Sequence, residues 1–167
     1  SGNTYPAIAL PWGMNFWSPQ TGKMGDGWMY SYTAEKLRGI KQTHQPSPWM
    51  NDYGQFSIMA MVDNKTFDQD KRSSYFSHKA TERASYFRFT FPKTNNAYVL
   101  IDAFDKGSYV EVIPKEQRII GYSTKNSGGV PENFKNYFVM SFDRPFANVA
   151  TFADSVLTDG RYMVKAD

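Results

Sequence analysis

The residues best equipped for chemistry lie in one short segment, residues 43–54. The segment supplies an imidazole, an amide, an indole and a carboxylate, from His44, Gln45, Trp49 and Asp52. Two prolines among them restrict the backbone to extended conformations. An indole can stack on the apolar face of a sugar ring, while the other groups bond its hydroxyls. The segment predicts a site for a polyhydroxylated ligand, and a rigid loop whose Trp49 plugs the core is an equally good interpretation.

Other catalytic patterns are missing from the sequence. It contains no nucleophile-elbow serine motif, no phosphate-binding glycine loop and no paired-histidine zinc motif. The chain has no cysteine, which excludes disulfides, thiolate zinc sites and cysteine nucleophiles. Asp63, Asp68 and Asp70 are spaced somewhat like a calcium loop, but the glycine and closing glutamate of such a loop are absent. A solvated loop is the better interpretation of this segment.

The composition describes a globular chain. Of 167 residues, 41% are hydrophobic and 21% charged, and the net charge is +3. This balance argues against a nucleic-acid binder, and no apolar run reaches the ~20 residues that span a bilayer. The chain opens Ser-Gly-Asn-Thr without a signal peptide, so we expect either a removed leader or a piece of a longer protein.

The elements that must position the candidate site are strands. Apolar and polar residues alternate or run together in many short segments separated by Gly, Pro, Asn or Asp. We expect a tight hairpin at Asp159-Gly160 and a strand over 97–101 that is buried on both faces. The strongest strand predictions are 55–62, 86–91, 97–101, 108–113, 118–123, 136–142, 149–152, 155–158 and 161–164.

Helix is expected only over residues 33–39, as one or two turns. Residues 1–53 hold all four Trp, a composition that predicts loops of special geometry. The short gaps between strands favour an antiparallel β-sandwich over alternating β-α-β units. The sequence therefore predicts an all-β fold with little helix.

Several motifs in fixed order give the chain a family resemblance. Over its whole length it resembles the N-terminal region of glycoside hydrolase family 92. The motifs that carry the resemblance are Gly2–Pro6, Pro11–Met14, Thr43–Gly54, Phe76–Lys79, Arg88–Pro92 and Asn126–Phe134.

The resemblance implies a distorted antiparallel sandwich of the supersandwich, galactose-mutarotase-like kind, filling residues 1–167. Family members are calcium-dependent, inverting exo-α-mannosidases, mostly from glycan-degrading bacteria, in which a helical (α/α)₆ barrel follows this domain. It implies that the barrel, absent here, supplies the general acid, the general base and most calcium ligands. The resemblance thus assigns no catalytic or metal-binding residue to this chain.

What remains for the chain is the rim of the sugar pocket. The residues expected there are Trp49, His44, Asp52, Gln45 and Asn3. The implied partners are mannose-containing glycans and the protein's own barrel, with no nucleic acid and no membrane span. The implied location is secreted, periplasmic or at the bacterial cell surface.

The chain departs from the family pattern at Ala80–Thr81. Family members carry another strand or two between the motifs on either side, so we expect missing residues there, with a true deletion as the alternative. An alternative function is a stand-alone carbohydrate-binding or adaptor module. A binding module would present aromatics on an open face, whereas half of a larger enzyme would show an apolar patch made to meet a partner. An independent small hydrolase has the least support.

Overall fold

The computed structural model describes residues 16–21, 37–43, 56–63, 77–80, 85–103, 107–126, 129–153 and 156–165. The chain divides into an N-terminal unit, Ser1–Asp52 with Phe56–Asp102, and a C-terminal unit, Tyr53–Gln55 with Ala103–Asp167. All strand pairs are antiparallel within the described residues, where the one helical element is a single 3₁₀ turn. The prediction of an all-β antiparallel fold with little helix is confirmed, and no described helix is long and apolar enough to cross a membrane.

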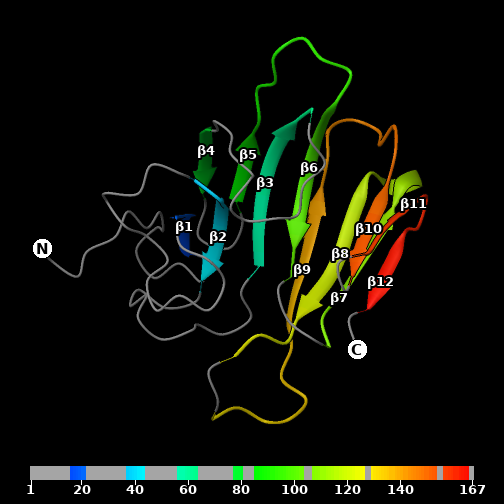
Figure 1. Cartoon of the computed structure of the whole chain (residues 1–167). Coiled ribbons are helices and arrows are strands. Elements are labelled where there is room, and N and C mark those ends of the chain that lie inside the picture. Colours follow the sequence, from blue (N-terminus) through cyan, green and yellow to red (C-terminus); the bar gives the residue numbers. More distant parts are fainter. Residues whose placement is uncertain are drawn as a thin grey trace, which may run out of the picture. The chain divides into compact units, whose positions relative to one another are not determined.

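The N-terminal unit contains one four-stranded sheet and one hairpin (Figure 1). The strands of the sheet follow the order β1-β2-β3-β6, and the hairpin pairs β4 with β5. Their bounds are β1 Phe16–Gln20, β2 Gly39–Thr43, β3 Phe56–Val62, β4 Ser77–Ala80, β5 Ser85–Arg88 and β6 Ala97–Asp102.

One face of this sheet forms the apolar core of the unit. Register places Ile40 opposite Ile58, and Ile58 opposite Ile101, so these side chains share a face. Trp17, 5% exposed, lies on the same face, and its ring meets Phe56 at 5.7 Å and 83°. It also meets Phe87 of β5 at 4.8 Å and 76°, so edge-to-face aromatic contacts join the hairpin to the sheet.

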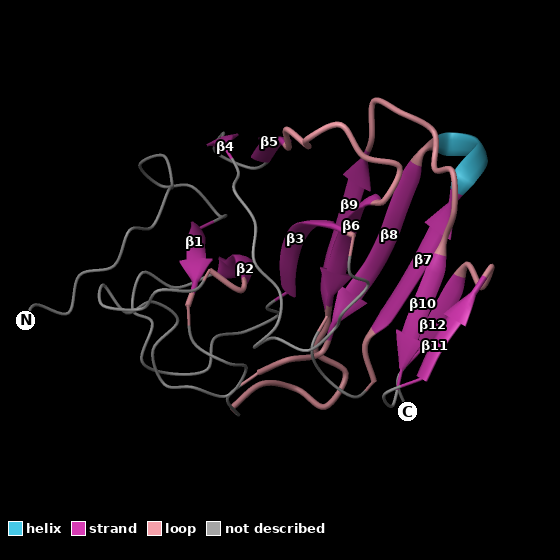
Figure 2. Ribbon diagram, turned by 45° about the horizontal axis from the view of Figure 1, so that its top comes forward, coloured by secondary structure: helices cyan, strands magenta, loops and turns pink. Residues whose placement is uncertain are grey.

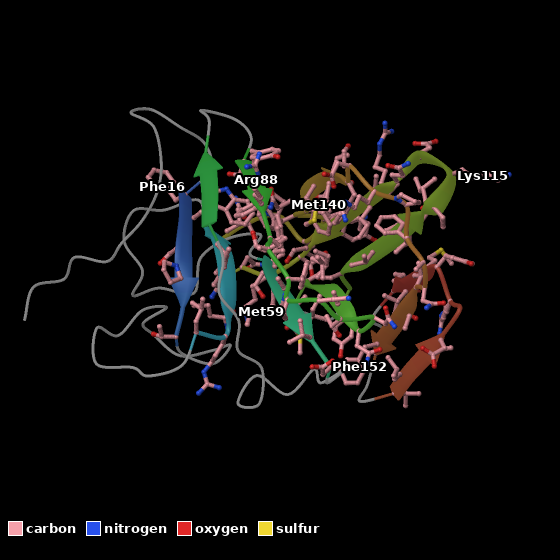
Figure 3. All side chains as sticks on the ribbon, turned by 90° about the horizontal axis from the view of Figure 1, so that it is seen from above. Phe16, Met59, Arg88, Lys115, Met140 and Phe152 are labelled. Atoms are coloured by element: carbon pink, nitrogen blue, oxygen red, sulfur yellow. The ribbon has the colours of Figure 1, made fainter. Side chains whose placement is uncertain are left out.

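The C-terminal unit contains a second four-stranded sheet, in the order β12-β7-β8-β9, and a β10-β11 hairpin (Figure 2). The single-turn 3₁₀ helix, Pro114–Glu116, connects β7 to β8 and ends at Gln117, whose φ is 51°. Lys115 in this turn is exposed (Figure 3). The strand bounds are β7 Tyr109–Ile113, β8 Arg118–Ser123, β9 Asn136–Ser141, β10 Ala150–Ala153, β11 Val156–Asp159 and β12 Met163–Lys165.

Gly121 allows close packing on one face of this sheet. A Cβ at this position would approach the carbonyl oxygen of Tyr109 far inside contact distance, and would lie 2.6 Å from Cζ of Phe138. The Phe138 ring therefore occupies the space that a side chain at Gly121 would need. Ile119 and Phe138, both 7% exposed, are buried on this face.

Two buried serines form hydrogen bonds that connect the residue before β7 to the last residue of β8 and the residue after it. Ser108 Oγ and Ser123 Oγ both donate to the carbonyl oxygen of Ala103, at 3.3 and 3.2 Å. Ser108 Oγ also accepts from the backbone N–H of Thr124, at 3.2 Å. Buried hydroxyls need such partners, because an unpaired polar group in the interior is costly.

Most predicted strands are present within one or two residues, but five expectations are wrong. The hairpin at Asp159-Gly160 does not form, because β11 pairs with β10 and β12 pairs with β7. Gly160, with φ of 71°, instead turns the chain from one pairing to the other. β6 is not buried on both faces, because none of its six residues is buried: Ala97 is exposed and the others are half-buried.

The other three wrong expectations concern the lengths and positions of strands in the first half of the chain. The strand expected over residues 86–91 ends at Arg88. β1 and β2 fall in a region expected to be loops, and Gly39 begins a strand instead of ending a helix. The rest of the expected helix, residues 33–36, lies outside the described residues.

Candidate functional site

The five residues predicted to contact sugar lie outside the described part of the chain. They are Asn3, His44, Gln45, Trp49 and Asp52. The strands that flank them, β1, β2 and β3, are described. Residues 44–55 connect the end of β2 to the start of β3, and residues 1–15 lead directly into β1.

The strand register brings those chain ends to one end of the N-terminal sheet. Phe16, the first residue of β1, is opposite Thr43, the last residue of β2. Phe56, the first residue of β3, is opposite Gln42. Both predicted segments therefore attach to the same end of the same sheet.

Next to that end, the sheet carries a row of polar residues that the sequence analysis missed. Ser18 is opposite Lys41, Lys41 is opposite Ser57, and Ser57 is opposite Asp102. Opposite residues of antiparallel strands share a face, so the row crosses all four strands. We call Ser18, Lys41, Ser57 and Asp102 the polar row.

Three residues of the polar row are buried, which is unusual for a lysine, and Asp102 is half-buried. Lys41 is 3% exposed, and Ser18 and Ser57 are fully or almost fully buried. Ser57 Oγ has no hydrogen-bond partner among the described residues. Gly39 lies beside it, and a Cβ there would be 3.4 Å from both Ser57 Oγ and Gln20 Oε1.

No local pattern in residues 39–43 singles out Lys41, because Ile40 is the one large apolar residue of this segment and three polar residues follow it. In sequence, a lysine in a short strand reads as solvent-facing. Its burial depends on polypeptide that covers this face of the sheet, which the local sequence does not show. Among the carboxylates, Asp102 ends β6 in the N-terminal unit and Glu111 belongs to the C-terminal unit.

A second candidate surface lies on the C-terminal sheet, on the face opposite Phe138. Register aligns Tyr109, Tyr122 and Tyr137 in one row across β7, β8 and β9. The next row aligns Met163, Glu111, Ile120 and Val139 across all four strands. We call Tyr109, Tyr122, Tyr137, Ile120, Val139 and Met163 the tyrosine face.

Side chains of the tyrosine face are ordered against each other. The rings of Tyr109 and Tyr122 stack at 5.6 Å and 17°, and Tyr137 meets Tyr122 edge-on at 5.5 Å and 62°. Lys135 Nζ lies 4.3 Å from the centroid of the Tyr122 ring, within cation–π range. These contacts fix the row before any ligand or partner arrives.

The pKa is raised for one tyrosine in each unit, but the main cause differs between the two. Tyr109 donates its hydroxyl hydrogen to Glu111 Oε2 at 2.7 Å, and this bond is the main reason that the pKa of Tyr109 is raised. The pKa of Tyr98 on β6 is also raised, first by burial and then by the negative charge of Asp63. In both cases the neutral phenol is favoured.

No metal centre is evident among the residues that the structure describes. No three carboxylate or histidine side chains come together there. His78 lies on β4, and of its side chain nothing is described. The described residues therefore do not by themselves fit a calcium ion.

Comparison with known proteins identifies a matching family and a similar solved structure. The family model for the glycosyl hydrolase family 92 N-terminal domain matches residues 1–80 and 79–166. A solved family GH92 inverting mannosidase from Bacteroides thetaiotaomicron is 42% identical over 99% of this chain, with a TM-score of 0.89. The chain spans 26% of the length of that mannosidase. No curated protein matches the chain.

Proposed function

The chain belongs to the N-terminal domain family of glycosyl hydrolase family 92, and on that premise we propose that it is the non-catalytic N-terminal domain of a calcium-dependent, inverting exo-α-mannosidase. One observation carries the proposal: 42% identity over 99% of the chain to an inverting mannosidase of the same family. The proposed role is to pack on a catalytic barrel and to lend loops to the rim of its sugar pocket.

A non-catalytic role agrees with the requirements of an inverting mechanism. Such an enzyme needs an acid and a base whose carboxyl groups are roughly 6.5–9.5 Å apart, with room for a water between them and the sugar. Among the described carboxylates, Glu111 accepts the hydroxyl of Tyr109 and Glu116 pairs with Arg118 at 2.9 Å. Neither is offered to a substrate as a free acid or base.

The contribution to the sugar pocket comes from the segments at one end of the N-terminal sheet. Trp49 is proposed to stack on the leaving-group sugar, with His44, Gln45, Asp52 and Asn3 bonding hydroxyls. The attachment of residues 1–15 and 44–55 to the same sheet end supports this grouping. Calcium is proposed to be bound mainly by the rest of the protein, and the protein to act outside the bacterial cytoplasm on mannose-containing glycans.

The test uses the complete gene product. We expect hydrolysis of mannobiosides with inversion at the anomeric carbon, followed by NMR, and loss of activity when a chelator removes calcium. The 167-residue chain alone is expected to show no turnover. An intact protein that fails on mannosides, or an active isolated chain, would overturn the proposal.

Trp49→Ala tests whether Trp49 contacts the sugar at the rim of the pocket. A rim indole predicts a fall in kcat/KM of about 10–100-fold, or about 1.4–2.8 kcal/mol of transition-state binding. The loss should be larger on disaccharides than on mannosides with a small leaving group. Trp49→Phe, which retains a stacking ring, is the control. Wild-type rates in a folded Trp49→Ala protein would remove Trp49 from the site.

We further propose that the natural protein carries additional residues between Ala80 and Thr81, and that it has not lost them by a true deletion. In support, the family model matches in two stretches that meet at residues 79–80. β4 ends at Ala80, which pairs with Ser85, so only residues 81–84 connect these strands. Peptide mass mapping of the natural protein across this junction would decide: an uninterrupted Lys79-Ala80-Thr81 peptide would show a true deletion.

A stand-alone carbohydrate-binding module remains the second candidate. The observation that favours it is the tyrosine face, where Tyr137 is 70% exposed. Titration of the chain with mannobiose and with yeast mannan, followed by NMR shifts at Tyr137, tests this reading.

A further inference from the structure

The exposed apolar side chains of the described residues are concentrated in one unit. Only Tyr86 lies in the N-terminal unit. The others belong to the C-terminal unit: Tyr137, Val139, Phe152, Val156, Leu157, Tyr162 and Met163. Exposed apolar surface gathered in this way is typical of an interaction site.

The C-terminal sheet has large apolar side chains on both faces. Ile119 and Phe138 are buried on one face, while their chain neighbours Ile120 and Val139 point to the other, on the tyrosine face. Val139 is 66% exposed and Met163 is 49% exposed. An antiparallel sheet with one face in water normally alternates apolar and polar residues. Charged residues do lie on the tyrosine face, at Glu111, Arg118 and Lys165, but β8 and β9 place Ile120 and Val139 at its centre. The tyrosine face is therefore built to be covered.

The charged groups around the face are already paired within the chain. Glu111 accepts from Tyr109, and Lys135 lies over the ring of Tyr122. Arg118 pairs with Glu116 at 2.9 Å. An apolar centre that contains three Tyr, Ile120, Val139 and Met163, with charged groups at its margins, has the composition of a protein–protein interface.

We propose that the tyrosine face is the docking surface for the remaining polypeptide of the same protein. This inference rests on the proposed function. The solved relative carries about three quarters of its length outside the part that this chain matches, so a large covalently linked occupant exists in the family. The stacked row of Tyr109, Tyr122 and Tyr137 loses little side-chain freedom when it is covered, which favours docking.

A sugar is the weaker occupant for this surface. A pyranose needs an open ring face with hydrogen-bonding groups around it. Tyr109 and Tyr122 cover each other, and Lys135 lies over Tyr122, which leaves the ring of Tyr137 alone. Val139 and Met163 beside it offer no hydrogen bond to a hydroxyl.

The test is hydroxyl-radical footprinting of the complete gene product, read by mass spectrometry. We expect oxidation of Tyr137 and Met163 to be at least 10-fold slower than in the same protein unfolded in urea. Tyr86, 57% exposed in the other unit, is the internal control and should react within about 3-fold of its unfolded rate. Equal reactivity of Tyr137 and Tyr86 would overturn the proposal.

If something else covered the tyrosine face, the footprinting result would differ from the one expected here. Protection that appears only at concentrations where light scattering shows a dimer would assign the face to a second copy. Protection that appears only after mannan is added would assign it to a sugar. A gene product without further polypeptide would leave no occupant in cis. Each of these outcomes overturns the proposal.

A matched pair of variants separates this interface from catalysis. Val139→Asp in the complete protein should raise oxidation of Tyr137 at least 5-fold, while Tyr86→Asp should leave it unchanged. Unchanged protection in a folded Val139→Asp protein would count against the interface. Mannoside hydrolysis is measured separately: a protected Tyr137 in an inactive protein would overturn the proposed activity and keep the interface, and an exposed Tyr137 in an active mannosidase would do the reverse.

Discussion

The two four-stranded sheets among the described residues differ in which side chains they bury. In the N-terminal unit, Ser18, Lys41 and Ser57 are polar and buried. In the C-terminal unit, Tyr137 and Val139 are apolar and exposed. Side-chain type therefore does not decide burial here, because what matters is whether polypeptide covers the face. Three residues of the polar row are covered within this chain, whereas Tyr137 and Val139 on the tyrosine face are exposed in it.

The largest expected effect comes from the core of the N-terminal unit. Trp17→Ala removes a ring that packs on both Phe56 and Phe87, so we expect a loss of about 3–5 kcal/mol in the free energy of unfolding. Urea denaturation followed by circular dichroism measures it. Trp17→Phe is the control and should cost much less, because it retains an aromatic ring and removes an indole N–H with no partner among the described residues. A loss below 1 kcal/mol for Trp17→Ala would show that this ring is not a core element.

The next effect tests the buried face of the C-terminal sheet. Gly121→Ala places a methyl group against Phe138 and the Tyr109 carbonyl, and we expect about 3 kcal/mol of destabilisation from overpacking. Gly160→Asn is the matched control: a Cβ there meets no atom within 4 Å, and asparagine tolerates the positive φ of 71°. A stable Gly121→Ala protein would mean that Phe138 packs elsewhere.

A smaller effect tests the exposed face. Val139→Thr keeps the shape of the side chain and adds a hydroxyl, which water can solvate at an exposed site. In the 167-residue chain we expect a change within about 0.5 kcal/mol. In the complete protein the same change buries the hydroxyl, and we expect a loss of about 1–3 kcal/mol. Equal thermal unfolding shifts in both contexts would contradict the proposed interface.

The smallest effect concerns tyrosine ionisation. Glu111→Gln removes the charged acceptor of Tyr109, so the pKa of Tyr109 should fall back toward its ordinary 10.0, while the pKa of Tyr98 stays raised by burial. Because the folded pKa is raised, the stabilisation from Tyr109 is complete below pH 10 and is lost as pH rises through the folded pKa. Ultraviolet titration of Tyr109→Phe and Glu111→Gln measures this. An unchanged titration curve in Glu111→Gln would exclude the hydrogen bond as the cause.

Sequence reasoning located most of the strands, because alternation is a local property. Residues 118–123 were predicted with the bounds that β8 has, and the family motifs led to the correct family. The five predicted rim residues remain predictions, since they lie outside the described residues. Register shows only that their segments attach at one end of a sheet.

What the sequence determined by itself was the fold class, the family and the positions of the strands other than β1, β2 and β4, since each depends on residue order along the chain. Only the tertiary structure decided that β12 pairs with β7, that Lys41 is buried and that Val139 is exposed. The physical reason is that pairing and burial are set by segments distant in sequence. A strand's alternation says which residues share a face, and only the neighbouring strands and layers decide which face meets water.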